Sequence, residues 1–187
     1  MRKVRREEIL GLAAYDVERE RIRREVLAAK ESRRVHVGRE LTFLFENADT
    51  IRYQIQEMVR VERLYREEEI RHELDTYNEI LGGPGVLGCT LLVEIDDPAE
   101  RDRKLREWVA LPGHLYAKLP DGSLVRPAYD RRQVGEGRLS SVQYLKFDVR
   151  GETPMALGSD LPALTVETAL APGQRAALSV DLRSDCA

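Results

Sequence analysis

The sequence has very few cysteines, which limits the redox chemistry and the metal sites that the chain can form. Its 187 residues include two, Cys89 and Cys186, which lie far apart and form no Cys-x-x-Cys pair. Thioredoxin-like dithiols and cysteine-ligated zinc sites both need such closely spaced pairs. We therefore expect neither. We expect Cys89 to be buried and inert in a strand, and Cys186 to lie in a frayed C-terminus.

Long apolar segments are also absent. No run approaches the ~18 apolar residues that a membrane-spanning helix needs. The basic start of the chain is similar to the first part of a signal peptide, but Glu7, Glu8 and Asp16 flank the short apolar stretch after it, and no small-residue cleavage site is present. We expect a soluble, cytoplasmic protein that does not bind membranes.

The net charge is small, although charge is unevenly distributed along the chain. A formal charge of −3 at pH 7 gives no bulk attraction to nucleic acid or to an anionic membrane. Residues 1–40 contain twelve Lys and Arg against eight Asp and Glu, whereas residues 62–80 contain seven acidic residues against three Arg. We interpret these segments as two helix faces of opposite sign and expect them to pair with each other.

The residues that are present, 42% hydrophobic and 34% charged, fit a globular protein with one core. Apolar residues at helical spacing predict a helix over 16–31, and β-branched and aromatic residues predict a hairpin over 35–45. Asn47 supplies an N-cap for one long helix over about 48–80. The glycine-rich segment 82–85 ends this helix.

The second half of the chain is rich in strand patterns. The sequence predicts strands over 90–95, 142–149 and 164–168, a helix from Pro98 to about Leu111, a hairpin turn at Asp121-Gly122, and either a strand or a short helix over 172–182. Helices followed by strands are typical of an α+β fold. We expect a single domain over 1–187, in which a helical half (about 1–81) packs on a mixed or antiparallel sheet and a strand-rich half (about 87–183) completes the chain.

One polar constellation in the predicted long helix is typical of metal chemistry. Continuing its apolar stripe at helical spacing brings Glu62, Glu69 and His72 close to one face. Glu69 and His72 have the Glu-x-x-His spacing of carboxylate-bridged di-iron helices, and iron is the metal that this pattern indicates. A complete di-iron site needs a second such motif, which the chain lacks. The alternative is a kink whose polar residues pair with the basic first helix.

Other catalytic motifs are missing from the sequence. There is no Gly-x-Ser-x-Gly, no P-loop and no Gly-x-Gly-x-x-Gly. His114 follows a Pro-Gly pair in a predicted loop, and no acid or nucleophile is recognisably linked to it. The arginines of the first helix, such as Arg21, Arg23 and Arg24, could touch phosphates, but the interleaved glutamates oppose this, so we do not expect nucleic-acid binding.

Residues 41–62, LTFLFENADTIRYQIQEMVRVE, resemble a bacterial family of unknown function, domain-of-unknown-function family 3501. The resemblance extends through the acidic segment 68–78 and the strand over 90–95, and it covers nearly the whole chain. Where similar proteins lead us to expect Asp-His-Pro, residues 160–162 are Asp-Leu-Pro, which removes a metal ligand. The matching polar positions are Glu46, Asn47, Gln54, Glu57, Arg60 and Glu62. Helical spacing would let Glu57 and Arg60 pair with each other.

The resemblance implies a cellular context but no catalytic residues. Proteins of this family tend to be encoded beside a rubrerythrin and an iron–sulfur oxidoreductase, which implies a part in peroxide defence or electron transfer. Our leading hypothesis is a non-catalytic accessory or interaction protein that acts with these redox partners and has no cofactor of its own. One alternative is an iron-dependent oxidoreductase that uses Glu62, Glu69 and His72, and a weaker one is a nucleic-acid-binding regulator. A homo-oligomer is compatible with any of these.

Overall fold

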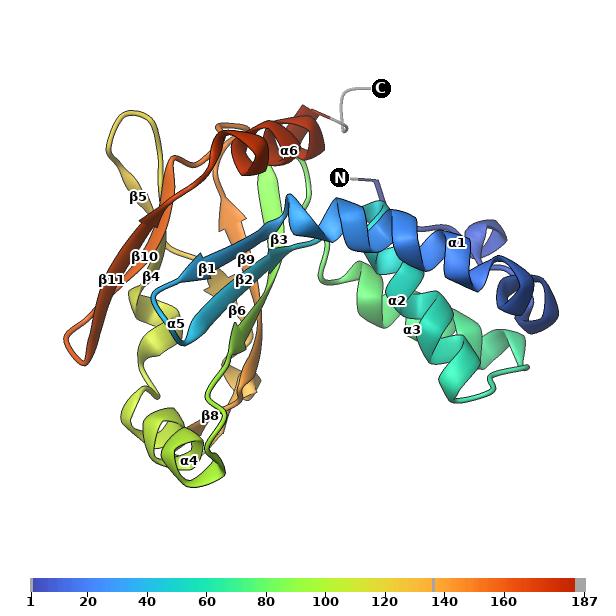
Figure 1. Cartoon of the computed structure of the whole chain (residues 1–187), viewed down its shortest axis with the longest axis horizontal. Helices are drawn as coiled ribbons and strands as arrows, with labels where there is room; N and C mark the ends of the chain where they lie inside the picture. Colours follow the sequence, from blue (N-terminus) through green and yellow to red (C-terminus); the bar gives the residue numbers. More distant parts are fainter. Residues whose placement is uncertain (1, 136, 184–187) are drawn as a thin grey trace.

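In the computed structural model of the chain, antiparallel sheets lie beside a group of three helices (Figure 1). The structure describes residues 2–135 and 137–183. The helices are η1 (Arg6–Glu8), α1 (Leu12–Glu31), α2 (Ala48–Val61), α3 (Glu67–Asn78), α4 (Pro98–Glu107), α5 (Leu111–His114), η2 (Arg131–Gln133) and α6 (Pro172–Arg183). The strands are β1 (Arg34–Val37), β2 (Leu41–Phe45), β3 (Val86–Val93), β4 (Leu115–Lys118), β5 (Leu124–Val125), β6 (Ala128–Tyr129), β7 (Val134–Gly135), β8 (Arg138–Leu139), β9 (Val142–Asp148), β10 (Ala156–Leu161) and β11 (Leu164–Ala169). This arrangement confirms the predicted α+β fold.

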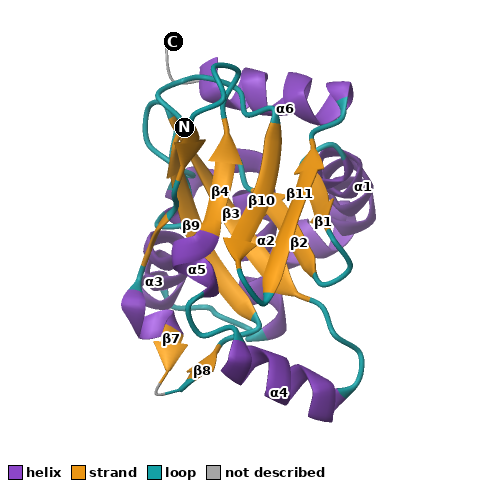
Figure 2. Cartoon of the chain, turned by 90° about the vertical axis from the view of Figure 1, so that its left-hand side faces the viewer, coloured by secondary structure: helices purple, strands orange, loops and turns teal. Residues whose placement is uncertain are grey.

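Two larger sheets form most of the strand-rich part of the molecule, and β7 and β8 pair in a separate two-stranded sheet. A five-stranded sheet has the order β1-β2-β3-β9-β6, and a four-stranded sheet has the order β11-β10-β4-β5. The four-stranded sheet faces the viewer in Figure 2, and the five-stranded sheet lies behind it. The predicted hairpin over 35–45 is confirmed as β1 and β2, and it joins the five-stranded sheet through β3, where Phe43 lies opposite Leu91. The rings of Phe43 and Phe45 each lie 6.4 Å from Phe147 in the core.

The prediction of a single long helix over about 48–80 is wrong, because two helices, α2 and α3, occupy this segment. The chain turns through residues 62–66. Arg63 adopts a left-handed backbone with a φ of 52°, and the Leu64 amide donates to the Val59 carbonyl at 3.0 Å. This turn lets Leu64 pack against the hydrophobic core. The one-residue slip in the apolar pattern of the sequence therefore marks a break between two helices.

Helix α2 begins where the sequence predicts, because Asn47 caps it. The Asn47 side-chain oxygen accepts hydrogen bonds from the backbone amides of Asp49 and Thr50, and the Thr50 hydroxyl accepts from the Asn47 amide. The buried face of α2 carries Ile51 and Ile55, both fully enclosed. In Figure 1, α1, α2 and α3 lie side by side on one flank of the sheets.

The second half of the chain follows most of the sequence predictions. The hairpin turn at Asp121-Gly122 is confirmed between β4 and β5, with Gly122 in the left-handed region at a φ of 86°. The segment over 172–182 is a helix, α6. Strand β10 is absent from the sequence prediction. Its Gly158 lies under the ring of Tyr116, and a Cβ there would be 2.5 Å from the Tyr116 hydroxyl, so a residue with low strand propensity is needed at this position.

The predictions about cysteine and membrane segments are tested in part. Cys89 is fully buried in β3, and burial raises the pKa of its thiol well above the usual value, as expected for an inert residue. Cys186 lies outside the described residues. Within residues 2–135 and 137–183, no helix is both long and apolar enough to cross a membrane.

Candidate functional site

Glu57 and Arg60, two polar residues of the segment 41–62 that resembles the family, connect helix α2 to helix α1. The Glu57 carboxylate accepts a hydrogen bond from the Tyr15 hydroxyl at 2.5 Å and from two nitrogens of Arg19 at 2.8 Å. The Arg19 guanidinium lowers the pKa of Glu57. Arg60 donates to Asp16 at 2.7 Å, whereas helical spacing predicts a pair with Glu57. Both side chains therefore serve contacts between helices.

Two further family-like positions hold the start of α2 against the sheet. Glu46 is buried, and its carboxylate accepts hydrogen bonds from the hydroxyls of Thr50 at 2.6 Å and Thr90 at 3.1 Å. The side-chain amide of Asn47 donates to Asp181 of α6 at 3.3 Å. These bonds connect α2, β3 and α6. Because Glu46 is enclosed, it has no route to a substrate in this conformation.

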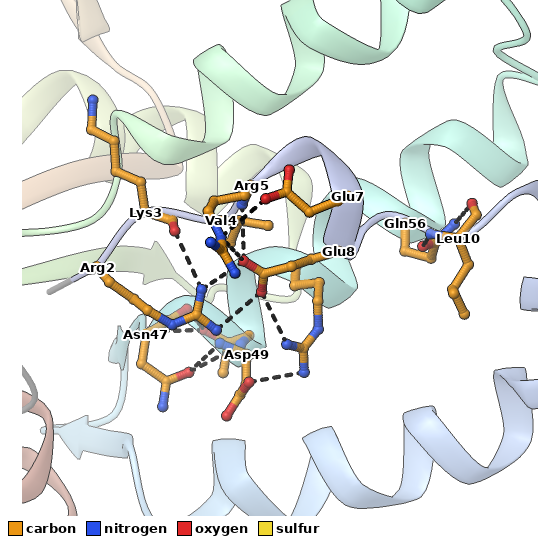
Figure 3. Close-up of polar contacts among 12 residues, drawn as sticks. Arg2, Lys3, Val4, Arg5, Glu7, Glu8, Leu10, Asn47, Asp49 and Gln56 are labelled. Carbon is orange, nitrogen blue, oxygen red and sulfur yellow. Dashed lines mark hydrogen bonds and ion pairs between the residues drawn. The ribbon is translucent and has the colours of Figure 1, made fainter.

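The segment before α1 is held by two side-chain amides. Asn78 of α3 donates to the Val4 carbonyl at 2.9 Å and accepts from the Val4 amide at 2.8 Å. Gln56 of α2 makes the same pair of bonds with Leu10, at 2.9 and 2.8 Å, as Figure 3 shows. Each amide side chain thus satisfies a backbone donor and acceptor that would otherwise lose their hydrogen bonds to water on burial. A cavity of about 480 Å³ lies beside this segment, between α1 and α2.

Glu8 is the main charged anchor of this segment, and its contribution should depend on pH. Its carboxylate accepts from Arg2 at 2.7 Å and from the Arg5 amide at 3.1 Å (Figure 3). It also lies 3.5 Å from Arg52. The hydrogen bond from Arg2 is the main cause that lowers the pKa of Glu8 from 4.5 to about 2. A carboxyl whose pKa is lower in the folded state stabilises the fold above the unfolded pKa, and this stabilisation is lost as the pH falls from about 4.5 toward 2.

We therefore expect Glu8→Gln to lower the free energy of unfolding by about 1–2 kcal/mol at pH 7. The difference from wild type should shrink at pH 3, since wild-type Glu8 is then largely protonated in the unfolded state. Urea unfolding at both pH values measures this. The control is Glu7→Gln, because the Glu7 side chain is 66% exposed, and its effect should stay within about 0.5 kcal/mol. An equal loss for Glu8→Gln at pH 7 and pH 3 would contradict the assignment.

The structure does not bring Glu62, Glu69 and His72 together as a metal site. Glu62 follows α2, whereas Glu69 and His72 lie on α3, and all three side chains are exposed. Glu69 accepts a hydrogen bond from the backbone amide of Arg66 at the start of α3. In the described part of the chain, no group of three or more His, Cys, Asp or Glu residues is arranged to hold a metal ion. The iron-dependent oxidoreductase stays a hypothesis of the sequence alone.

A groove lies between α3 and the β6–β9 edge of the five-stranded sheet, and sequence reasoning missed it. Its volume is about 490 Å³, within the roughly 300–1,000 Å³ that ligand sites occupy. Tyr77 of α3, Tyr129 of β6 and Tyr144 of β9 all line it. Burial is the main cause that raises the pKa of Tyr77, and the charges of Glu73 and Tyr144 raise it further, so the phenol stays neutral. A hydrogen bond with Gln54 opposes this shift. The family-like Gln54 thus contacts a groove tyrosine.

Several carboxylates of α3 and its C-cap form no ion pair within the described part of the chain, and two of them line this groove. Glu67 is different, because it pairs with Arg6 and Arg71, both at 2.9 Å. Five other acidic residues of α3 and its C-cap form no ion pair with a described side chain: Glu68, Glu69, Glu73, Asp75 and Glu79. The expected pairing of the acidic segment with the basic start of the chain is therefore confirmed only for Glu67 and Arg6. Arg21 of α1 pairs with Glu18 and Glu25 of its own helix, at 2.8 Å each.

A second polar network lies on the outer face of the four-stranded sheet. His114 shares a hydrogen bond of 2.8 Å with Asp160, which also pairs with Arg126. Arg126 and His114 together lower the pKa of Asp160 to about 2. Tyr116 donates to Glu167 at 2.9 Å. Sequence reasoning found no acid for His114, because Asp160 is 46 residues further along the chain. The network connects β4, β10 and β11 and satisfies its own charges.

The fold defines an α+β protein built mainly on two antiparallel sheets, and comparison with known proteins assigns it to a family. The family model described as "Protein of unknown function (DUF3501)" matches residues 3–182, so the chain belongs to this family. The chain is also similar to a solved structure, a novel protein of unknown function from Burkholderia pseudomallei K96243. That match has a TM-score of 0.89 and 28% identity, over 97% of this chain and 100% of the other. No curated protein matches the chain.

Proposed function

We propose that this protein is a non-catalytic interaction protein that binds a basic segment of a partner protein in the groove beside α3. The observation that carries the proposal is the groove itself, which three tyrosines line. Tyrosine is enriched where proteins bind each other, because it offers apolar area with little conformational entropy. The carboxylates of Glu73 and Glu79 at the groove form no ion pair with a described side chain, so charge complementarity favours a basic occupant.

The positions of the family-like polar residues support binding over catalysis. A catalytic carboxylate must come within hydrogen-bond reach of its substrate. Glu57 is engaged by Arg19 and Tyr15, and Glu46 is buried beneath α2. These residues hold α1 and α2 in place, and α2 packs against α3, the helix that forms one wall of the groove. Their part in the proposal is therefore to position α3.

The family resemblance supplies candidate partners. We propose that the protein acts as an accessory factor for a rubrerythrin-like protein or for an iron–sulfur oxidoreductase, in peroxide defence or electron transfer. Accessory proteins of this kind need recognition surfaces of complementary charge more than reactive groups. The basic segment would belong to one of these two partners.

The test is direct binding between purified proteins. We expect at least one of the two candidate partners, a rubrerythrin-like protein and an iron–sulfur oxidoreductase from the same genome, to bind the wild-type chain in titration calorimetry. The variant Glu73→Gln/Asp75→Asn/Glu79→Gln should weaken that binding about tenfold at low salt, because three complementary charges are removed. High salt should weaken wild-type binding in the same direction.

The matched control removes three other carboxylates that are exposed and form no ion pair with a described side chain. It is Glu31→Gln/Asp96→Asn/Glu152→Gln, which makes the same change in net charge away from the groove. This control should bind the partner as wild type does. Absence of binding by both candidates, or equal weakening by the two triple variants, would overturn the proposed function.

A further inference from the structure

Tyrosine rings outside the groove already have cations over their faces. The ammonium of Lys30 lies 5.9 Å from the centre of the Tyr53 ring, and the guanidinium of Arg126 lies 5.6 Å from that of Tyr116. Among the described residues, no lysine or arginine lies in this way over the ring of any of the three groove tyrosines. The groove tyrosines therefore have no cation of the described chain in this position, and each of them still lines the groove.

The charges around the groove favour a cation as well. Glu73 and Glu79 form no ion pair with a described side chain, whereas Asp130 is held by Arg132 at 2.5 Å. Arg132 is near enough to Glu79 for the Glu79 charge to raise its pKa. Lys146 is the one base among the lining residues. The groove thus carries three carboxylates against two cations, Lys146 of the lining and the neighbouring Arg132.

The ring faces and the surplus of acid select the same kind of ligand. A tyrosine ring presents negative charge on its face, and a nearby carboxylate adds to this attraction. A neutral apolar side chain would gain the burial but neither of the electrostatic contributions. An anion would be repelled both by the ring faces and by the carboxylates.

We propose that the groove is a cation–π site, in which a lysine side chain of the partner's basic segment places its ammonium against Tyr77, Tyr129 and Tyr144. Glu73 and Glu79 hold the same ammonium from the α3 side. This inference rests on the proposed function and names the chemistry by which the partner is recognised. It assigns the tyrosines to specificity and the carboxylates to attraction.

Fluorine NMR of the full chain labelled with 3-fluorotyrosine tests the site directly. The chain has seven tyrosines, and single substitutions assign their signals. The probe is a short glycine–serine peptide with one central lysine, and its control carries norleucine in place of lysine. We expect the lysine peptide to shift the signals of Tyr77, Tyr129 and Tyr144. Tyr53 and Tyr116, which already face cations, should not respond.

Two groove variants separate the ring contribution from the charge contribution. Tyr144→Leu keeps apolar area and should weaken binding of the lysine peptide about threefold. Glu73→Gln/Glu79→Gln should weaken it by about three- to tenfold at low salt. The control is Tyr65→Leu, because the Tyr65 side chain is 74% exposed and does not line the groove. It should leave the affinity unchanged.

The outcomes distinguish this inference from the proposed function. If the norleucine peptide shifts the groove signals as strongly as the lysine peptide, or if neither shifts them, the cation–π site is overturned. Partner binding that survives Tyr144→Leu but is lost with the three α3 carboxylates would overturn the ring contribution and keep the docking surface. Groove signals that respond to the lysine peptide while both candidate partners fail to bind would support the site and overturn the choice of partner.

Discussion

Gly88→Ala should destabilise the protein by about 3 kcal/mol or more, because the added methyl group has no room. A Cβ at Gly88 would lie 2.0 Å from the carbonyl oxygen of Ile80 and 2.9 Å from the amide nitrogen of Gly82. Both atoms belong to the backbone, so neither can rotate away as a side chain does. Urea unfolding or the yield of folded protein measures the loss.

The matched control for this substitution is Gly83→Ala. A Cβ at Gly83 meets nothing within 4 Å, and the backbone there is not left-handed. Its effect should stay within about 0.5 kcal/mol. Because Ile80 also lines the groove, a partly folded Gly88→Ala protein should lose partner binding as well. Equal stability of Gly88→Ala and Gly83→Ala would show that the backbone of residues 80–82 does not pack closely against Gly88 of β3.

Asp181→Ala should cost about 3–5 kcal/mol, because it leaves Arg33 as a buried charge without its carboxylate. Arg33 donates to the two oxygens of Asp181 at 2.7 and 2.9 Å, and their side chains are 11% and 6% exposed. Asn47 at the start of α2 also donates to Asp181. The substitution therefore weakens the contact of α6 with both the start of β1 and α2. Chemical unfolding at pH 7 measures the change.

A double substitution shows whether the loss comes from the unpaired charge. Replacing both partners, in Arg33→Met/Asp181→Leu, removes the desolvation penalty together with the attraction, and it should restore most of the lost stability. A double variant that is as unstable as Asp181→Ala would mean that the pair contributes shape or further hydrogen bonds beyond its charge. The control is Asp102, an exposed carboxylate that pairs with Arg106 and Arg138, and Asp102→Ala should have a much smaller effect than Asp181→Ala.

Local patterns in the sequence predict the elements whose causes are local. The Asn47 cap, the Gly122 turn and the hairpin before α2 all depend on residues within a few positions of each other, and all three are confirmed. The break between α2 and α3 is visible as a slip in the apolar pattern. Its interpretation as one helix fails because the left-handed turn falls on Arg63, a residue type that gives no sequence sign of such a backbone.

The candidate site depends on contacts that no local pattern contains. Tyr77, Tyr129 and Tyr144 come from three elements, and only the packing of α3 against the sheet brings them to one groove. Glu62, Glu69 and His72 form a pattern only if the helix is continuous, so the break removes the premise of the metal site. The basic and acidic segments meet at Arg6 and Glu67, but α1 pairs its arginines within itself and with Glu57.

The order of strands in the five-stranded sheet also sets the order in which the chain can fold during synthesis. Strand β3 pairs with β2 on one side and with β9 on the other, where Leu87 lies opposite Phe147. The first helices and the β1–β2 hairpin leave the ribosome well before β9. Until then β3 has an unpaired edge, and closing the long loop to β9 should limit the folding rate. This interval is when a nascent chain is most exposed to wrong strand pairing, so slower translation after residue 93 should increase its dependence on chaperones.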